Sequence, residues 1–268
     1  MSNWFSKTIC LVLVAVFILA GCERKYEKDV DVLASEPNLV TLSVPSDYAA
    51  RAIKAAGGLD AWTKTKELQL DCVVTFYQPD GSFYLTEQSY EVYPWSNAIR
   101  ISAQEPKGRF VWQLTKGKFD VLEGTEQIDN FPSAVGGYCF AEAILNIITA
   151  PARLLDKSVE FTEQTVAVKI QGQWYYPINR QSRTFFGLAE RLSDAVFYQN
   201  RDNSLIDMFW LACRMGDKFL TVRGYDYKEL EKGGNLVPAR IEIFSADARG
   251  SYQKQLVKID CHALGRAE

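Results

Sequence analysis

Residues 68–83 read LQLDCVVTFYQPDGSF, and this pattern sets the class of the fold. Leu68, Leu70, Cys72, Val74 and Phe76 alternate with side chains that are polar at every position except Val73. A period of two is typical of a strand with one buried face and one solvated face. The turn-forming residues Pro79-Asp80-Gly81-Ser82 follow, and a second strand-like run begins at Phe83. We therefore predict an antiparallel hairpin.

The same alternation of short strands and tight turns continues along most of the chain. Strands this close together must pair antiparallel, because parallel pairing needs long crossovers. The sequence predicts a mainly β fold with helices, built from a curved antiparallel sheet of about 10 or 11 strands. After the hairpin, the expected strands are 98–103, 109–115, 118–122, 159–171, 173–176, 190–199, 204–214, 218–227, 236–245 and 251–261.

Two main helices are expected. One covers residues 47–56, with Ser46 as its N-cap and Gly57-Gly58 as its left-handed end. The other covers residues 138–148 and is ended or kinked by Pro151. Because the second helix is almost entirely apolar, it must pack against the inner face of the sheet.

The N-terminus has the features of a secretory signal. Lys7 precedes an apolar run from Ile9 to Ile18, which is shorter than the roughly 20 residues of a membrane-spanning helix. The run ends in Leu19-Ala20-Gly21-Cys22, which resembles a bacterial lipobox. That resemblance implies removal of residues 1–21 and diacylation of the Cys22 thiol, with diacylglycerol and palmitate as the attached groups. Glu23 in place of Asp favours sorting to the outer membrane.

The rest of the chain divides into three parts. Residues 22–45 are read as a lipidated N-terminus and flexible tether, residues 46–262 as one domain, and residues 263–268 as a C-terminal tail. The formal net charge changes from −3 to −4 when residues 1–21, with one lysine and no acidic residue, are removed. This balance gives no reason to expect nucleic acid as a partner. The aromatic content of 13% fits a β-rich core or, alternatively, a surface for apolar ligands.

Four further cysteines, Cys72, Cys139, Cys213 and Cys261, show neither CxxC nor metal-ligand spacing. We expect buried free thiols, with a single disulfide as the alternative and its partners left open.

Catalytic motifs are missing from the sequence. His262, the single histidine, follows the last expected strand, where an exposed position explains it better than a catalytic triad. Neither GxxxxGK[ST] nor GxGxxG occurs, and no spacing singles out a pair among the many carboxylates. The sequence predicts no enzyme, no cofactor and no metal site. A hydrolase using two carboxylates is the remote alternative.

The order of elements resembles the bacterial Lol system of lipoprotein carriers and receptors. The resemblance rests on the lipobox, the helix ending in Gly57-Gly58-Leu59-Asp60-Ala61-Trp62, the strand meander, the central apolar helix and a closing pair of strands. That closing pair contains Gly224-Tyr225-Asp226-Tyr227 and Leu236-Val237-Pro238-Ala239-Arg240-Ile241-Glu242-Ile243. The resemblance implies an incomplete barrel, covered by helices, whose concave side binds acyl chains without a cofactor.

The resemblance also suggests where a ligand would lie. The side chains expected to line an apolar cavity are Leu70, Val74, Phe76, Ile101, Trp112, Ile144 and Ile148. Phe185-Phe186-Gly187-Leu188 is the best candidate for the protruding apolar loop of the Lol receptor, although a buried turn explains it equally well. A lipidated Cys22 fits a stationary receptor or sensor better than a soluble shuttle.

We therefore expect an envelope lipoprotein, anchored in the outer membrane and facing the periplasm, that binds a lipid or lipoprotein acyl chain. The alternative is a structural or interaction lipoprotein that presents its sheet to another envelope protein and has no ligand cavity. The two differ in where apolar side chains lie, since the alternative needs an exposed apolar patch on the outside.

Overall fold

The predicted hairpin forms the start of the sheet. β1 (Leu68–Tyr77) and β2 (Phe83–Tyr93) pair antiparallel from Leu68↔Val92 to Tyr77↔Phe83. The structure is a computed structural model that describes residues 46–105, 108–124, 135–156, 159–181, 195–213, 218–230, 234–248 and 250–266. The expected signal, the Cys22 lipobox, the tether and the 185–188 loop lie outside these residues.

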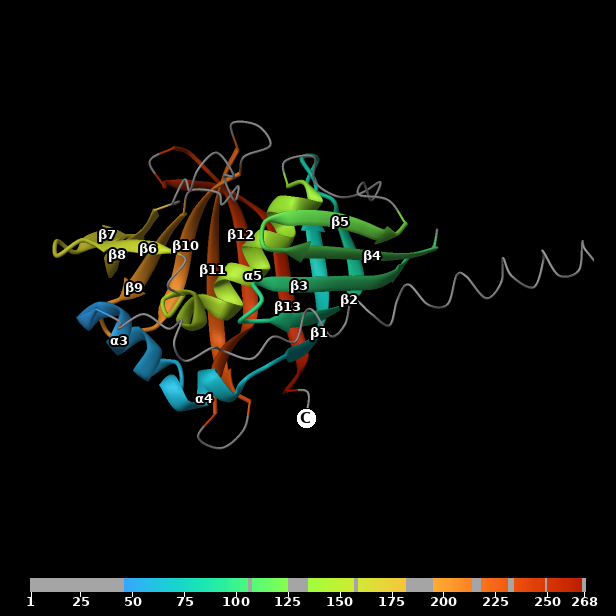
Figure 1. Ribbon diagram of the computed structural model, residues 1–268. Helices are drawn as coiled ribbons and strands as arrows, with labels where there is room; N and C mark the ends of the chain where they lie inside the picture. Colours follow the sequence, from blue (N-terminus) through green and yellow to red (C-terminus); the bar gives the residue numbers. More distant parts are fainter. Residues whose placement is uncertain are drawn as a thin grey trace, which may run out of the picture.

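One antiparallel sheet of thirteen strands dominates the molecule (Figure 1). Its order is β5-β4-β3-β2-β1-β13-β12-β11-β10-β9-β8-β6, with β7 paired to β8. This path begins at β5 and ends at β6, so the sheet is open, as predicted. The other strands are β3 (Ala98–Glu105), β4 (Gly108–Thr115), β5 (Lys118–Glu123), β6 (Glu160–Glu163), β7 (Val168–Ile170), β8 (Gln173–Gln181), β9 (Ala195–Asn200), β10 (Ile206–Cys213), β11 (Lys218–Glu229), β12 (Leu236–Ala246) and β13 (Tyr252–Arg266).

The expected runs of the chain, counted with the hairpin, are twelve, and the structure has one strand more because residues 159–171 form two strands instead of one. β6 and β7 both pair with β8, and the gap between them lies opposite Pro177, whose nitrogen has no proton to donate. The carbonyl of Pro177 instead accepts a hydrogen bond from the Gln164 amide at 2.9 Å. Pro177 thus interrupts the ladder.

The first and last strands meet in the middle of the sheet. β13 pairs with β1 and continues to Arg266, which lies opposite Leu68. Residues 263–266, expected in a tail, therefore belong to the sheet. Cys72 and Cys261, directly opposite each other on these strands, form a disulfide. The expectation of free thiols is wrong for this pair and agrees with the structure for Cys139 and Cys213, which are free and buried.

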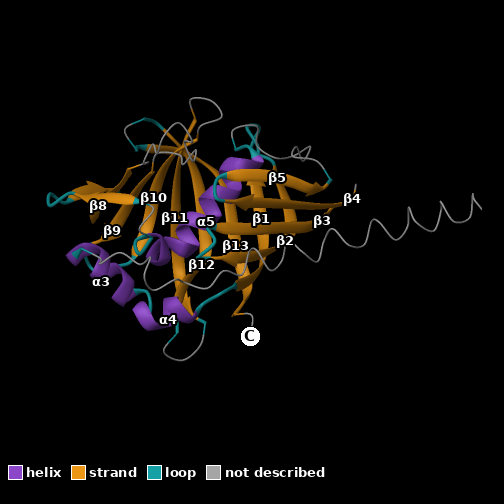
Figure 2. Ribbon diagram, in the orientation of Figure 1, coloured by secondary structure: helices purple, strands orange, loops and turns teal. Residues whose placement is uncertain are grey.

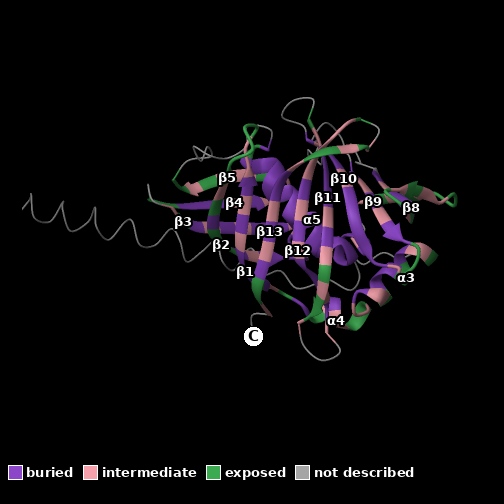
Figure 3. Ribbon diagram, turned by 180° about the vertical axis from the view of Figure 1, so that it is seen from behind, coloured by how far each residue is buried: buried purple, intermediate pink, exposed green. Residues whose placement is uncertain are grey.

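Helix α5 (Gly137–Arg153) lies within the curve of the sheet (Figures 1 and 2). All 17 of its residues are buried, and in the view from behind the strands of the sheet lie in front of the helix (Figure 3). The helix does not end before Pro151, as one form of the prediction held, but continues through it to Arg153. The φ of proline is compatible with a helix, and its missing N–H costs one backbone hydrogen bond. The apolar surface that the helix buries on both sides of Pro151 outweighs that cost.

Helices α3 (Asp47–Ala55) and α4 (Leu59–Lys64) lie at one end of the sheet (Figure 1). Ser46 caps α3 as predicted, by accepting a hydrogen bond from the Ala49 amide. Gly57 and Gly58, with φ values of 110° and 90°, end α3 in the left-handed region. The backbone at Gly57 also lies close to the segment before β12. There the Leu236 amide donates a hydrogen bond to the Ala56 carbonyl at 3.0 Å.

The two glycines differ in the space around them, which gives a prediction. A Cβ on Gly57 would lie 2.4 Å from the Gly234 carbonyl oxygen, whereas one on Gly58 would meet nothing within 4 Å. Gly57→Ala should lower the free energy of unfolding by about 2 kcal/mol more than Gly58→Ala, because only Gly57→Ala adds a backbone clash to the cost of a positive φ. Urea unfolding of both variants measures the difference. Equal losses would contradict the proposed close approach.

Candidate functional site

The candidate site is the concave face of the sheet together with α5. The apolar side of the helix packs on side chains that point inward from the strands, and the Phe76 and Phe140 rings lie 5.7 Å apart between centroids. β4 and β5 add a second aromatic group, in which Trp112 lies 4.6 Å from Phe110 and 6.0 Å from Phe119. The helix and the sheet thus bury one continuous apolar surface.

The seven predicted lining residues come together here. Each is at most 2% exposed, and all belong to the same core cluster. β1 supplies Leu70, Val74 and Phe76, β3 and β4 supply Ile101 and Trp112, and α5 supplies Ile144 and Ile148. Their convergence agrees with the pattern from which they were chosen. Their role as ligand contacts stays a prediction.

None of the seven side chains is open to solvent. Two clefts that are lined by described residues lie elsewhere, and neither includes any of the seven. One, of about 310 Å³, contains Asp71, Ser89, Arg109 and the exposed His262. The other, of about 350 Å³, lies between the turns around Gln171 and Gly250.

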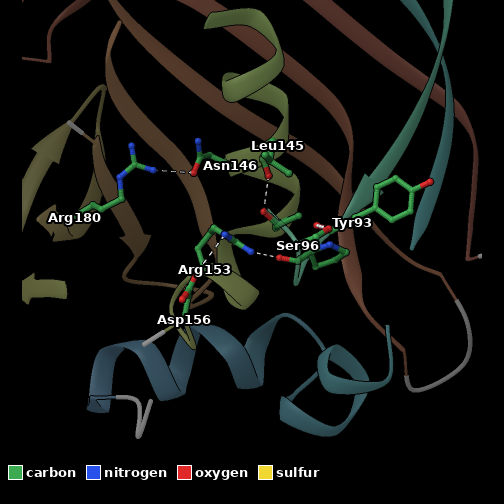
Figure 4. Close-up of polar contacts among 9 residues, drawn as sticks. Tyr93, Ser96, Leu145, Asn146, Arg153, Asp156 and Arg180 are labelled. Carbon is green, nitrogen blue, oxygen red and sulfur yellow. Dashed lines mark hydrogen bonds and ion pairs between the residues drawn. The ribbon is translucent and has the colours of Figure 1, made fainter. Parts of the chain in front are cut away.

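Four polar side chains recur along α5, and Figure 4 shows two of them, Asn146 and Arg153, with their polar partners. Glu142, Asn146, Thr149 and Arg153 are each at most 5% exposed. Asn146 donates to the Glu142 carbonyl at 2.8 Å, and Thr149 donates to the Leu145 carbonyl at 2.6 Å. These two bonds satisfy polar groups within the helix itself.

The ends of this polar row tie α5 to other elements. Arg180 on β8 lies 3.3 Å from the Glu142 carboxylate and donates to the Asn146 side-chain oxygen at 3.3 Å. Near the other end, Arg153 donates to the Pro94 carbonyl in the β2–β3 turn and pairs with Asp156 at 3.5 Å. Burial lowers the pKa of Arg153 to about 10, although the Asp156 charge opposes this shift. Even at that value Arg153 is charged at neutral pH.

Sequence reasoning missed this polar row. Glu142, Asn146, Thr149 and Arg153 recur at helical spacing, so their common side of α5 was visible in the sequence. Arg180 could not be found in that way, because its pairing with Glu142 depends on how β8 lies beside the helix.

A second buried polar cluster occupies the opposite face of the sheet, on β8 to β13. Arg223 donates to the hydroxyls of Tyr175 and Tyr252, both at 3.1 Å. Asp207 accepts from the Asn200 amide at 2.7 Å and is 8% exposed. Burial raises the pKa of the Asp207 carboxyl, although bonds from Asn200 and Tyr175 and the Arg223 charge favour its ionised form. These side chains come from five strands, β8 to β11 and β13, and Asp207 Oδ1 and Arg223 Nε are buried without a hydrogen-bond partner.

Two further findings limit what the described residues can do. No group of three or more His, Cys, Asp or Glu side chains among them is placed to hold a metal ion. Of the helices that the structure describes, none is both long enough and apolar enough to cross a membrane.

The buried ion pair on α5 gives a second prediction. Arg180→Met should lower the free energy of unfolding by about 3–5 kcal/mol, because it leaves the Glu142 carboxylate buried without its charge partner. The double variant Glu142→Gln/Arg180→Met should lose less than the sum of the single changes. Urea unfolding measures all three. The control is Lys64→Met, which breaks an exposed pair with Asp60 and should change stability little. Equal effects of Arg180→Met and Lys64→Met would contradict the prediction.

Asp207 gives a third prediction, which concerns pH. A carboxyl whose pKa is higher in the folded state binds its proton more tightly there. The free energy of unfolding of the protein therefore falls as the pH rises above about 4, the ordinary aspartate pKa. Asp207→Asn removes this loss. The stability of Asp207→Asn relative to the unmodified protein should therefore be more favourable at pH 8 than at pH 4, as measured by chemical unfolding at both values. A constant difference, or one of opposite sign, would show that burial does not dominate at Asp207.

Comparisons with known proteins agree with this architecture. No model of a protein family matches the sequence, and no curated protein sequence is significantly similar to it. Among solved structures, a LolA superfamily protein from Nitrosomonas europaea aligns over 84% of this chain and 95% of its own, with a TM-score of 0.53 and 12% identity.

Two further structures align less closely. A DUF1329 family protein from Desulfovibrio piger has a TM-score of 0.44 and 11% identity, over 82% of this chain and 91% of its own. A putative outer membrane lipoprotein-sorting protein domain from Vibrio parahaemolyticus has a TM-score of 0.42 and 8% identity, over 81% and 93%. The match to the Nitrosomonas protein shows that this chain, an open antiparallel sheet curved around a central helix, has a LolA-like fold, as the sequence resemblance predicted.

Proposed function

We propose that the protein is a non-catalytic envelope lipoprotein that binds a lipid, or the acyl chain of another lipoprotein, on the concave face of its sheet. The observation that carries the proposal is the burial of α5 on the concave face of the sheet. An entirely buried, mainly apolar helix covers the concave face, and polar bonds to other elements occur at the two ends of its polar row. The helix thus occupies the place that an acyl chain would take.

Because α5 and the predicted lining residues are buried in one core cluster, we propose that α5 moves when an acyl chain binds. An acyl chain can replace those contacts without leaving apolar surface in water. Burial contributes about 25 cal/mol per Å² of apolar area, before the cost of association is subtracted. Ligand and helix therefore compete for one surface.

The anchoring part of the proposal rests on the sequence. Cys22 would carry the lipid, and residues 22–45 would let the domain stand away from the bilayer. At about 3.3 Å per residue an extended tether reaches tens of ångströms. The outer membrane is favoured by Glu23. Such a protein would receive or sense acyl chains at the membrane surface.

A matched pair of substitutions on β1 tests the binding face. Val74 is fully buried in the core cluster that also contains α5, whereas its neighbour Val73 points to the other side of the sheet and is partly exposed. In residues 23–268, Val74→Thr should weaken binding of a fluorescent fatty acid roughly tenfold, because the added hydroxyl would contact the acyl chain without a partner. Val73→Thr should leave the affinity unchanged. Fluorescence titration measures both.

Native mass spectrometry of the same protein gives an independent readout. A copurified lipid, released by solvent extraction, would support the proposal and identify the ligand class. A protein that is empty, and that also ignores the fluorescent fatty acid while its circular dichroism shows it folded, would refute the proposal.

One observation favours the alternative of an interaction lipoprotein. Phe83 and Leu85, on alternate positions of β2, are 62% and 52% exposed and lie on the same side of the sheet. A patch of this kind fits contact with another envelope protein. An empty protein whose association with envelope proteins is lost on Leu85→Ser would shift the assignment to this function.

A further inference from the structure

The concave face of β2 carries polar side chains among the apolar ones. Thr86, Gln88 and Tyr90 alternate with exposed residues, and they share the face that Tyr90 contributes to the apolar core. Gln88 is 2% exposed and lies opposite Cys72 of β1 and Ala103 of β3. A glutamine in such a wall needs hydrogen-bond partners for its amide oxygen and for its amide nitrogen.

The oxygen of the Gln88 amide has a partner, and the nitrogen has none among the described residues. The Tyr90 hydroxyl donates a hydrogen bond to Gln88 Oε1 at 2.9 Å, which orients the amide. The side chains opposite offer no acceptor, because Ala103 has no polar side-chain atom and the sulfur of Cys72 belongs to the disulfide. A buried donor without an acceptor costs free energy, which a bound acceptor would recover.

This free donor lies within the predicted binding wall. Leu70 and Val74 flank the β1 position that pairs with Gln88, and Ile101 is two residues from its partner on β3. All three belong to the set expected to contact an acyl chain. An acyl chain carries its polar atoms in an ester, amide or acid group at one end, and the carbonyl oxygen of that group is a hydrogen-bond acceptor.

The polarity of the concave face changes near Gln88. Towards one end of the strands, Ile101 and Trp112 pair across β3 and β4 and are fully buried. Towards the other end, the Thr86 hydroxyl donates to the carboxylate of Glu105, which is the last residue of β3 and is partly exposed. The two ends of an acyl chain differ in the same way. The wall therefore suits a chain whose polar group lies at Gln88.

We propose that the amide nitrogen of Gln88 donates a hydrogen bond to the carbonyl oxygen of the bound acyl group, so that the site selects acyl esters and amides over plain hydrocarbons. The inference deepens the proposed function and rests on it. The same carbonyl occurs in a glycerolipid and in the acylated N-terminus of a lipoprotein.

Two fluorescent probes of equal chain length test the contact, one ending in a methyl ester and one in a plain hydrocarbon. Both are titrated into residues 23–268, which contain every residue that the structure describes. Gln88→Met keeps the length of the side chain and removes its donor. It should weaken binding of the ester about fivefold to tenfold and leave binding of the hydrocarbon unchanged.

Gln104→Met is the matched control, because it makes the same change at an exposed position of β3 next to Ala103. It should alter neither affinity. The ratio of the two affinities within one variant does not depend on the fraction of that variant that is folded. An equal loss for ester and hydrocarbon in Gln88→Met would overturn the proposal.

Infrared spectroscopy tests the same bond in the unmodified protein. With a ¹³C label in the ester carbonyl of the bound probe, a hydrogen-bonded carbonyl stretches at a lower frequency than the same ester in an apolar solvent. We expect the lower frequency in the unmodified protein and in Gln104→Met, and its loss in Gln88→Met. A frequency equal to that in the apolar solvent in the unmodified protein would overturn the proposal.

The same titrations separate this proposal from the proposed function. If neither probe binds although circular dichroism shows the protein folded, the proposed function is refuted and the carbonyl contact falls with it. If both bind with no effect of Gln88→Met, the binding face stands and only the carbonyl contact is refuted.

Dipalmitoylglycerol and a diacylated lipopeptide, titrated as competitors of the ester probe, distinguish the two sources of the carbonyl. The tighter competitor identifies the source, and Gln88→Met should weaken it by the same factor as the probe. A competitor that binds equally well to Gln88→Met and to the unmodified protein would overturn the contact for that ligand.

Discussion

The burial of α5 against the concave side of the sheet is the interaction on which the rest of the structure depends. A helix whose 17 residues are all buried cannot exist at the surface of a protein, and an open sheet of this width cannot fill its own interior. Each element therefore removes the other's apolar surface from water. The contact of Phe76 with Phe140 and the burial of Trp112 are local forms of the same requirement.

Charges buried along α5 modify this simple picture. Glu142, Arg153 and Arg180 lose hydration in the folded state, and their pairing compensates for that loss only while the helix is in place. Purely apolar side chains would hold the helix as well or better. A helix held by apolar burial and by directional polar bonds has one defined position on the sheet. If it moves away, its apolar and its charged side chains are exposed together.

Local order in the sheet was predictable from the sequence, and long-range order was not. Alternation from Leu68 to Phe76 gave the bounds of β1 closely, and the glycines at 57 and 58 marked the end of α3, because those signals lie within a few residues of what they determine. The Cys72–Cys261 bond spans 189 positions, and the sequence offers no local sign of it. The seven concave residues could be listed from their alternation, but the polar tie between Arg180 and Glu142 required the placement of β8 beside α5.

The place of β13 in the sheet has a consequence for the order of folding. Strands β1 to β5 pair with their neighbours in sequence, and so do strands β8 to β12, with β6 added beside β8. β13 alone joins the two groups, because it pairs with β1 on one side and β12 on the other. A chain that is synthesised from its N-terminus can form β1 to β5 early, yet β1 keeps an unpaired edge until β13 follows. Pairing between strands so far apart in sequence slows folding. Meanwhile the unpaired N–H and C=O groups along the edge of β1 stay exposed and can pair with another chain. Until then, β1 is the edge at which another chain would add.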